Sequence, residues 1–251
     1  MRRLLIRPGA IGDFILSLPA LEALRASYTE VWCAQQNVSL ARFADFARSI
    51  SSAGLDRLGL LPADDVIARL RSFDSIVSWY GTNRPEFREL VHGLGLPFQF
   101  LPALPTEEGR HATDFYNRQA RGTGAGAPSR FPHLPVPQTR RAFAVVNPFA
   151  SRISKRAPVE LFQTVAGRLA KSMPVQWLRG PEETWSGAVF IPDLFDLACW
   201  LGGARIYVGS DTGISHLAAA VGTPVLVFFR DTDPKVWAPR GPAVQIAYAS
   251  A

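Results

Sequence analysis

The chain has 251 residues, of which 47% are hydrophobic, so it is long and apolar enough for one large or two modest domains with a real core. Lys and Arg number 27 against 21 Asp and Glu, and the resulting charge of +6 favours acidic partners, above all phosphorylated small molecules. The basic residues form no block of five and no stripe interleaved with aromatic residues, which argues against nucleic acid as a partner.

Neither the hydrophobic runs nor the cysteines suggest a membrane protein or a disulfide scaffold. No apolar run approaches the roughly 20 residues that cross a bilayer, and the N-terminus becomes charged again too early for a signal peptide. Cys33 and Cys199 are too few for a disulfide framework and lack metal-ligand spacing. We therefore expect a cytoplasmic protein with no transmembrane segment.

In the first half, apolar strand-like runs alternate with segments of helical period. Strands are predicted at 4–7, 31–34 and 75–79, and helices at 13–26, 38–48, 64–72, 85–94 and 111–121. This alternation is typical of βαβ units, in which helices cover both faces of a parallel sheet.

A segment rich in Gly, Ala and Pro follows at 122–139 and is the predicted linker. After it, strands are predicted at 143–147, 175–178, 206–208 and 225–229, and helices at 159–171, at 193–202 and from about residue 214. The predicted fold class is α/β, with two Rossmann-like domains at 1–135 and 136–251 that face each other across a cleft. Nucleotides and their co-substrates bind in such clefts.

The most informative stretch is 207–229, where a β-branched strand ends in a polar turn and a helix of small residues begins. Such a turn directs unpaired backbone N–H groups and the positive end of a helix dipole at one spot. Gly213 would let a ligand approach the main chain. The turn therefore suits an anion, although an ordinary strand-to-helix turn capped by Asp211 is an equal alternative.

The opening strand runs into a second glycine-containing turn, Arg7-Pro8-Gly9-Ala10-Ile11-Gly12-Asp13. Gly9 and Gly12 relax the backbone there, but their spacing matches neither the dinucleotide fingerprint nor a Walker loop. Asp13 stands where an N-cap would, and capping is the simpler interpretation. The alternative is functional, since a carboxylate at this edge of the cleft could accept a proton from a substrate hydroxyl.

Two further strand ends carry charged residues. The first is followed by Ser151-Arg152-Ile153-Ser154-Lys155-Arg156, and cations just before a helix oppose its dipole unless an anion is bound there. A solvated basic loop is the alternative. The second is followed by Glu182 and Glu183, either of which could bind ribose hydroxyls or be a surface charge.

Together these motifs resemble glycosyltransferase family 9, the ADP-heptose:lipopolysaccharide heptosyltransferases. The similarity rests mainly on Arg7, Gly12 and Asp13 with Pro19, Leu21, Leu24 and Arg25, and on Ser210-Asp211-Thr212-Gly213-Ile214-Ser215-His216-Leu217-Ala218-Ala219. Weaker support comes from Lys155 with Pro158, Glu160 and Phe162, and from Thr232-Asp233-Pro234 with Trp237-Ala238-Pro239.

The resemblance implies a GT-B fold and an inverting, metal-independent transferase that uses an ADP-sugar, heptose above all, with no further cofactor. Asp13 would be the general base, and Lys155 with Thr212 and Gly213 would offset the charge of the departing diphosphate. Asp211 would hold sugar hydroxyls, Ser151 would line the donor site, Glu182 or Glu183 would bind the ribose, and His216 would be a structural or phosphate contact.

The acceptor implied by the family is a lipopolysaccharide core or related envelope glycan, acidic and presented at the inner membrane face, where the enzyme would lie peripherally. Arg84 and Arg88 are the candidate acceptor-binding residues. The chain is short for the family, which predicts a reduced N-terminal domain, and shows no long terminal helix. A non-catalytic sugar-nucleotide-binding protein with a degenerate acceptor domain is therefore the alternative function.

Asp231-Thr232-Asp233 has the Asp-x-Asp form that metal-dependent glycosyltransferases use to hold a divalent ion on a sugar diphosphate. Its place in the family-like Thr-Asp-Pro segment favours loop capping, so we predict no metal. A generic Rossmann oxidoreductase is disfavoured, because no Gly-x-Gly-x-x-Gly precedes an acidic residue at the usual distance.

Overall fold

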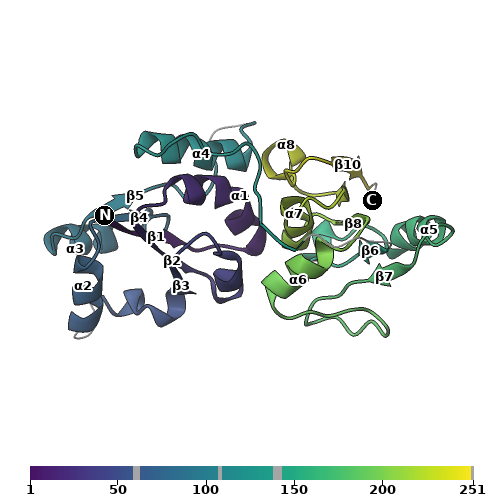
Figure 1. Cartoon of the computed structure of the whole chain (residues 1–251), viewed down its shortest axis with the longest axis horizontal. Helices are drawn as coiled ribbons and strands as arrows, with labels where there is room; N and C mark the ends of the chain where they lie inside the picture. Colours follow the sequence, from purple (N-terminus) through teal and green to yellow (C-terminus); the bar gives the residue numbers. More distant parts are fainter. Residues whose placement is uncertain (59–62, 107–108, 138–142, 250–251) are drawn as a thin grey trace.

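A computed structural model describes residues 1–58, 63–106, 109–137 and 143–249. Two α/β lobes lie side by side along the long axis, each built around its own five-stranded sheet (Figure 1). The N-terminal lobe comprises residues 1–122 and the C-terminal lobe residues 143–249. The predicted fold class is thus confirmed, whereas a domain boundary at 135/136 and a reduced N-terminal domain stay predictions.

The N-terminal lobe alternates strands and helices as predicted. Its strands are β1 (Arg2–Arg7), β2 (Tyr28–Cys33), β3 (Phe46–Ser49), β4 (Ser75–Ser78) and β5 (Phe98–Phe100). Its α-helices are α1 (Ile11–Ala23), α2 (Asp64–Arg71), α3 (Pro85–Gly93) and α4 (Ala112–Gly122), and short 3₁₀ turns span Gln35–Leu40, Ile50–Ser52 and Leu55–Arg57.

The C-terminal lobe repeats this alternation. Its strands are β6 (Ala144–Asn147), β7 (Val175–Trp177), β8 (Ile206–Ser210), β9 (Val225–Phe229) and β10 (Val244–Tyr248). Its helices are α5 (Val159–Leu169), α6 (Leu194–Leu201), α7 (Gly213–Ala220) and α8 (Pro234–Trp237), with one 3₁₀ turn at Ile153–Lys155.

Both sheets are parallel throughout and each reverses its strand order once. The order is β3-β2-β1-β4-β5 in the first sheet and β10-β9-β8-β6-β7 in the second. Ligands of open parallel sheets bind at the carboxyl ends of the strands where the order reverses. The two reversal points lie between β1 and β4 and between β6 and β8. Their carboxyl ends lead into the Asp13 turn and into the Lys155 and Asp211 loops.

Buried helix faces join the two lobes into one body. Phe14, Ile15, Leu18 and Leu21 of α1 are almost completely buried, as are Leu217 to Ala220 of α7. Helix α1 packs against α4 on one side and against α7 on the other (Figure 1). The short alanine side chains of α7 allow this close approach, so the N-terminal ends of both helices reach the junction between the lobes.

One predicted helix is wrong, and three short elements were missed. In place of a helix at 38–48, a 3₁₀ turn ends at Leu40 and strand β3 begins at Phe46. The backbone of Asp45 and its side chain both bond to Thr29 (Asp45 N to Thr29 O 3.0 Å, Thr29 N to Asp45 Oδ2 2.8 Å), so the segment joins the sheet instead. Strands β5 and β10 and helix α8 were not predicted, because edge strands and single-turn helices bury too few side chains to leave a clear period.

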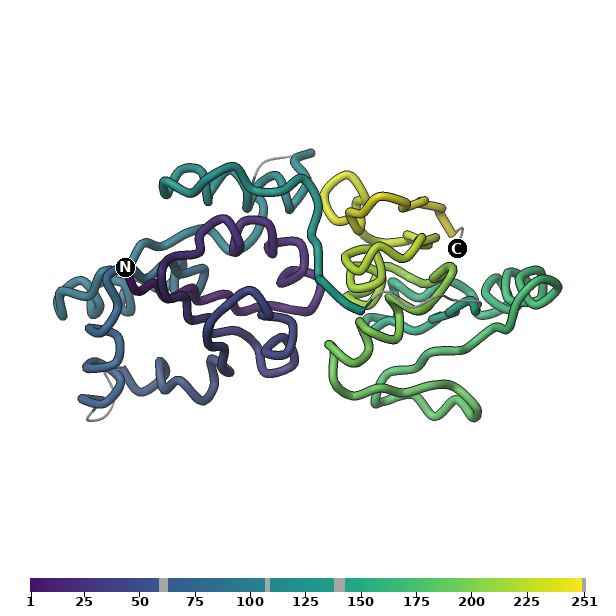
Figure 2. Tube along the Cα trace, in the orientation of Figure 1, coloured from purple at the N-terminus to yellow at the C-terminus, as the bar shows by residue number. Residues whose placement is uncertain are grey.

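The predicted linker connects the lobes without a helix or strand of its own over its described residues, and residues 138 and 139 lie outside that range. Figure 2 shows the segment passing once from α4 to the second sheet. It is tied down on the way, since Ser129 O accepts a bond from Asn117 Nδ2 (3.0 Å) and Leu134 N donates to Ala220 O (2.9 Å). The linker is therefore packed against both lobes.

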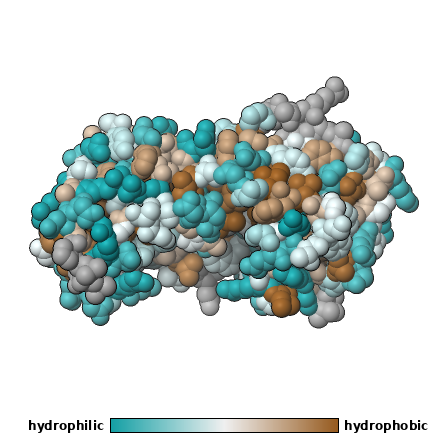
Figure 3. Space-filling view, turned by 90° about the horizontal axis from the view of Figure 1, so that it is seen from below, coloured by the Kyte–Doolittle hydropathy of each residue, from teal (hydrophilic) through white to brown (hydrophobic). Residues whose placement is uncertain are grey.

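Seen from below, hydrophilic side chains prevail over the N-terminal lobe, and apolar side chains gather in a group on the C-terminal lobe near the junction (Figure 3). Among the described residues, no helix combines the length and the hydropathy needed to cross a membrane.

Candidate functional site

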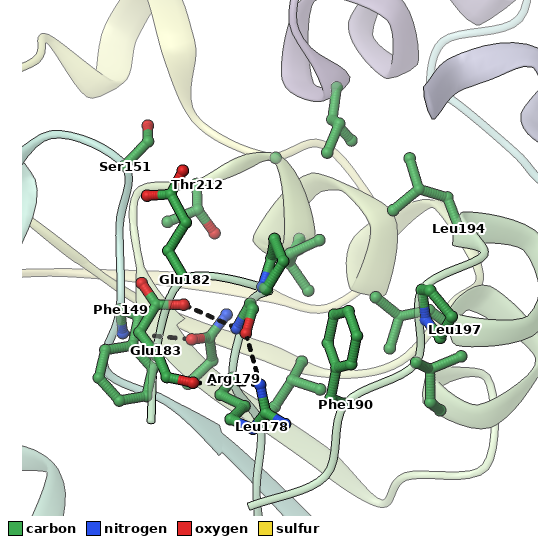
Figure 4. Close-up of a pocket in the computed structure, with 18 of the residues that line it drawn as sticks. Phe149, Ser151, Leu178, Arg179, Glu182, Glu183, Phe190, Leu194, Leu197 and Thr212 are labelled. Carbon is green, nitrogen blue, oxygen red and sulfur yellow. Dashed lines mark hydrogen bonds between the residues drawn. The ribbon is translucent and has the colours of Figure 1, made fainter. Parts of the chain in front are cut away.

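A cavity of about 520 Å³ opens at the carboxyl ends of β6, β7 and β8, beside the junction of the lobes (Figure 4). Most of its lining comes from the C-terminal lobe, and Ile11 and Gln36 of the N-terminal lobe close one side. Apolar side chains form one wall: Phe149, Leu178, Phe190, Ile191, Pro192, Leu194 and Leu197. Ser151, Glu182, Glu183, Thr212 and Gly213, all predicted from sequence, also line it. An apolar wall with a few convergent polar groups is typical of a small-molecule site.

The two candidate glutamates differ in their surroundings. Glu183 Oε2 accepts a bond from Gly180 N (2.9 Å), and its Oε1 lies 3.3 Å from the guanidinium of Arg156. Glu182 is exposed, and its carboxylate extends toward Ser151 and Thr212 in Figure 4. Glu183 therefore shapes the loop after β7, while Glu182 keeps its carboxylate available for a ligand.

Lys155 and Asp211 form an ion pair at the same edge of the sheet. The Lys155 ammonium lies 2.6 Å from Asp211 Oδ2, and the Asp211 side chain is only 3% exposed. Thr232 Oγ1 donates to the same carboxylate oxygen at 2.5 Å. The prediction that Asp211 caps the helix is wrong, because Thr212 is at the cap position. A contact of Asp211 with sugar hydroxyls stays a prediction.

The first turn of α7 leaves two buried polar atoms without a hydrogen-bond partner among the described residues, Thr212 Oγ1 and His216 Nδ1. Burial, partly offset by the charge of Asp211, lowers the pKa of His216 to about 4, so the imidazole is neutral near pH 7. Its Nε2 lies 3.9 Å from Asp211 Oδ1, beyond hydrogen-bond length. These atoms and the free N–H groups of the helix start can accept a bound anion.

Asp13 lies in the first turn of α1, half-buried, and does not cap the helix as the N-cap residue. Ala10 is at that position, and Asp13 Oδ2 accepts a long bond of 3.3 Å from its N–H. Beneath the turn, the buried Arg7 guanidinium donates to Asp13 O (3.1 Å) and Pro8 O (3.0 Å). Gly9 has a φ of 125°, which explains why glycine is required there.

The two turns meet at a glycine from each lobe. A Cβ on Gly213 would lie 2.5 Å from Ile11 Cβ and 3.1 Å from Gly12 N, and a Cβ on Gly12 would lie 3.1 Å from His216 Cδ2. Glycine at both positions therefore lets the backbone of each helix start pack against a side chain of the other lobe. Asp13 itself does not line the cavity, whereas Ile11, two residues earlier in the same turn of α1, does.

The two arginines expected at an acceptor site do not line the first cavity. Arg84 precedes α3 and donates to Tyr80 Oη at 2.9 Å. Arg88 lines a second cavity of about 580 Å³ with Phe98 and Phe100. Their binding of an acceptor stays a prediction.

The Asp-x-Asp motif is engaged in protein contacts. Asp231 Oδ2 accepts from Ser154 Oγ (2.8 Å), and Asp233 Oδ1 caps α8 through Lys235 N (2.9 Å). In the described parts of the chain, no three His, Cys, Asp or Glu residues come together in a way that could hold a metal ion. Independence from metals stays a prediction.

Some residues of the site were not singled out from sequence. They are the apolar wall of the cavity, the pairing of Arg156 with Glu183 and the contact of Thr232 with Asp211. Phe149 follows β6 and Pro148, and Phe190 lies between an isolated bridge at Val189 and Pro192, so neither stands in a segment with a periodic signal. Thr232 is part of the Asp-x-Asp motif noted in the sequence, but its contact with Asp211 depends on β8 and β9 being neighbours in the sheet.

The comparisons with known proteins agree with this arrangement. The family model described as glycosyltransferase family 9 (heptosyltransferase) matches residues 193–250. The chain superposes on the E. coli heptosyltransferase WaaC with ADP with a TM-score of 0.74 at 18% identity, covering 100% of this chain and 94% of that chain. No curated protein sequence matches the chain significantly.

Two further solved structures are similar. A glycosyltransferase of family 9 from Veillonella parvula gives a TM-score of 0.78 at 16% identity, covering 99% of this chain and 86% of the other. The E. coli ADP-heptose lps heptosyltransferase II gives a TM-score of 0.72 at 16% identity, covering 99% of this chain and 93% of the other. The predicted resemblance to the family is thus confirmed, in sequence over residues 193–250 and in fold over the whole chain, and it supports the prediction of a glycosyltransferase.

Proposed function

We propose that this chain is an inverting glycosyltransferase that moves a sugar, heptose, from an ADP-linked donor to an acidic envelope glycan of the lipopolysaccharide-core type. The donor is inferred from the solved structures with the same fold, whose names include ADP and ADP-heptose. We further propose that the protein works in the cytoplasm, at the inner membrane face where such acceptors are presented. The absence of a metal or other cofactor is part of this proposal.

One observation carries the proposal. The turn that bears Asp13 abuts the turn that bears Thr212 and Gly213, through a junction of two glycines beside the cavity. This juxtaposition of the two turns supports the proposal that a carboxylate of one lobe acts on a substrate whose phosphates are held at the helix start of the other. A transferase that joins a nucleotide sugar to a second substrate needs this combination, since the two substrates come from opposite sides.

In the proposed donor complex, the nucleoside occupies the apolar part of the cavity and the diphosphate lies toward α7. Glu182, whose carboxylate is available, binds the ribose hydroxyls, and Ser151 lies beside it. Lys155, Thr212 and the first N–H groups of α7 offset the negative charge that grows on the leaving ADP. His216, neutral and buried, acts as a phosphate contact through its unpartnered nitrogen.

In the proposed reaction, Asp13 removes the proton of the acceptor hydroxyl while that oxygen attacks the anomeric carbon. The bond from this carbon to the phosphate oxygen breaks, and ADP leaves with the electron pair. Because the nucleophile and the leaving group stand on opposite faces, a single displacement inverts the anomeric centre. Arg84 and Arg88 remain the proposed contacts to an acidic acceptor, at a distance from the reacting atoms.

The test is release of ADP from ADP-heptose in the presence of cell-envelope acceptors. General-base assistance contributes about 10² to 10⁴ in rate, so Asp13→Ala should lose that factor while binding ADP as well as the wild type. Asp65→Ala, which removes an exposed carboxylate of α2 in the same lobe, is the matched control and should turn over normally. Normal turnover in Asp13→Ala would contradict the mechanism. Tight ADP-sugar binding without transfer to any envelope acceptor would select the non-catalytic alternative.

A further inference from the structure

The Lys155–Asp211 pair is held by a third residue that the proposed mechanism does not use. The order of the second sheet places the end of β8 between the ends of β6 and β9. Asp211, just after β8, therefore has the Lys155 turn on one side and the segment after β9 on the other. Thr232 belongs to that segment, and its hydroxyl reaches the carboxylate from the side opposite to Lys155.

Both donors use the same oxygen. Lys155 Nζ and Thr232 Oγ1 lie 2.6 Å and 2.5 Å from Asp211 Oδ2, while the ionisable group paired with Oδ1 among the described residues is His216, whose Nε2 lies 3.9 Å away. A carboxylate with one occupied and one unoccupied oxygen can turn about its terminal bond unless something fixes it. The hydroxyl of Thr232 supplies this restraint, because it fixes which oxygen faces Lys155.

The neighbouring contacts join the same two segments. Ser154 Oγ donates to Asp231 Oδ2 at 2.8 Å, and Arg230 Nη1 donates to Arg156 O at 2.7 Å. Residues 230–232 thus hold the basic turn 154–156 at three points, one of them through Asp211. A lysine ammonium sits on a flexible four-carbon stem, so its position depends on such partners.

We propose that Thr232 is a positioning residue for the donor diphosphate: its hydroxyl fixes the Asp211 carboxylate, which in turn holds the Lys155 ammonium beside the start of α7. Thr232 touches neither the nucleotide nor the sugar in this assignment. The assignment rests on the proposed function, since it concerns the part of the site assigned to the diphosphate. It also assigns a role to the Asp-x-Asp motif, because its central residue, Thr232, positions Lys155 through Asp211.

The test compares binding of ADP and of adenosine, which lacks the diphosphate, by calorimetry. Thr232→Val removes the hydroxyl and keeps the shape, and loss of a hydrogen bond to a charged group should raise the dissociation constant of ADP about tenfold. Adenosine binding should not change. Thr232→Ser, which retains the hydroxyl, should bind ADP within about twofold of the wild type, and Thr232→Ala should behave like Thr232→Val.

Two controls separate positioning from general damage. Thr164→Val makes the same change on the exposed face of α5, where the hydroxyl bonds only to Glu160 O (2.8 Å), and should leave both ligands unaffected. In a Lys155→Ala background, Thr232→Val should add nothing to the loss of ADP affinity, because there is no ammonium left to position. Thermal midpoints of all variants show whether each is folded.

The outcomes are distinguishable. Equal ADP dissociation constants in the wild type and Thr232→Val would overturn the role of Thr232 and leave the proposed function intact. Parallel losses of ADP and adenosine, or losses that add in the double variant, would also overturn it. A wild type that binds no ADP would overturn the proposed function and the positioning role together.

Discussion

The Asp13 turn and the Asp211 turn meet at the junction of the lobes and have the same local structure, but the two aspartates have different surroundings. Each follows a buried parallel strand, contains a glycine at the contact and begins a helix of the core. Asp13 accepts one long bond from a backbone N–H and stays half-buried. Asp211 is buried, paired with a lysine and bonded to a threonine. The same local design thus yields a carboxylate with one long backbone bond in one lobe and a buried, ion-paired carboxylate in the other.

This contrast predicts that the stability of the protein depends far more on the second turn than on the first. Lys155→Met leaves the Asp211 charge buried without its partner, which should lower the free energy of unfolding by about 3 kcal/mol. Asp13→Asn should change it by less than about 1 kcal/mol, the scale of a charge near a helix start. Urea denaturation measures the free energy of unfolding of both variants, and equal losses in Lys155→Met and Asp13→Asn would contradict the difference between the two turns.

The next largest effect concerns the neutral imidazole of the second turn. Because burial lowers the pKa of His216 to about 4, the unfolded chain binds its proton first as the pH falls below about 6.5. The stability due to neutral His216 is therefore present above pH 6.5 and lost as the pH falls toward 4, by about 2 kcal/mol at pH 5. His216→Gln should flatten the pH dependence of unfolding between pH 7 and 5. An unchanged slope would show that the imidazole is not held neutral by burial.

The smallest effect tests the backbone contact between the turns. Gly213→Ala places a methyl group against Ile11 and Gly12 N, and such overpacking should cost about 1 to 2 kcal/mol and separate the lobes. Gly167→Ala on α5 meets no atom within 4 Å and is the matched control, expected to stabilise by about 0.5 to 1 kcal/mol. Thermal denaturation compares them, and a harmless Gly213→Ala would mean that the lobes do not meet as closely as described.

Much of this arrangement could be predicted from sequence, for identifiable reasons. The long helices were predicted from the helical period of their apolar residues, and the central strands from runs of β-branched residues. Glycine after a strand indicated a ligand-facing turn. The sequence could not separate Glu182 from Glu183, because the difference lies in Arg156 and Gly180, which only the folded loop brings to Glu183. It also could not predict that Thr232 contacts Asp211, since the two residues are 21 positions apart along the chain.

The acceptor side illustrates a different limit. Arg84 and Arg88 follow a strand end, as ligand-binding residues do, and Arg88 lines the second cavity rather than the first. A helical segment spreads its charges over several faces, so the sequence alone could not show which cavity each arginine faces.

The single passage of the described chain between the lobes has a consequence for how the protein is made. The first sheet and its covering helices are complete at Gly122, so they can fold while the ribosome is still adding the second half. Arg240 is added only after the second sheet has been largely made, and it reaches back to Asp114 with two bonds of 2.7 Å and 2.6 Å. The contact between Arg240 and Asp114 therefore forms only when both lobes have been made. The cavity beside the junction is likewise complete only at that stage.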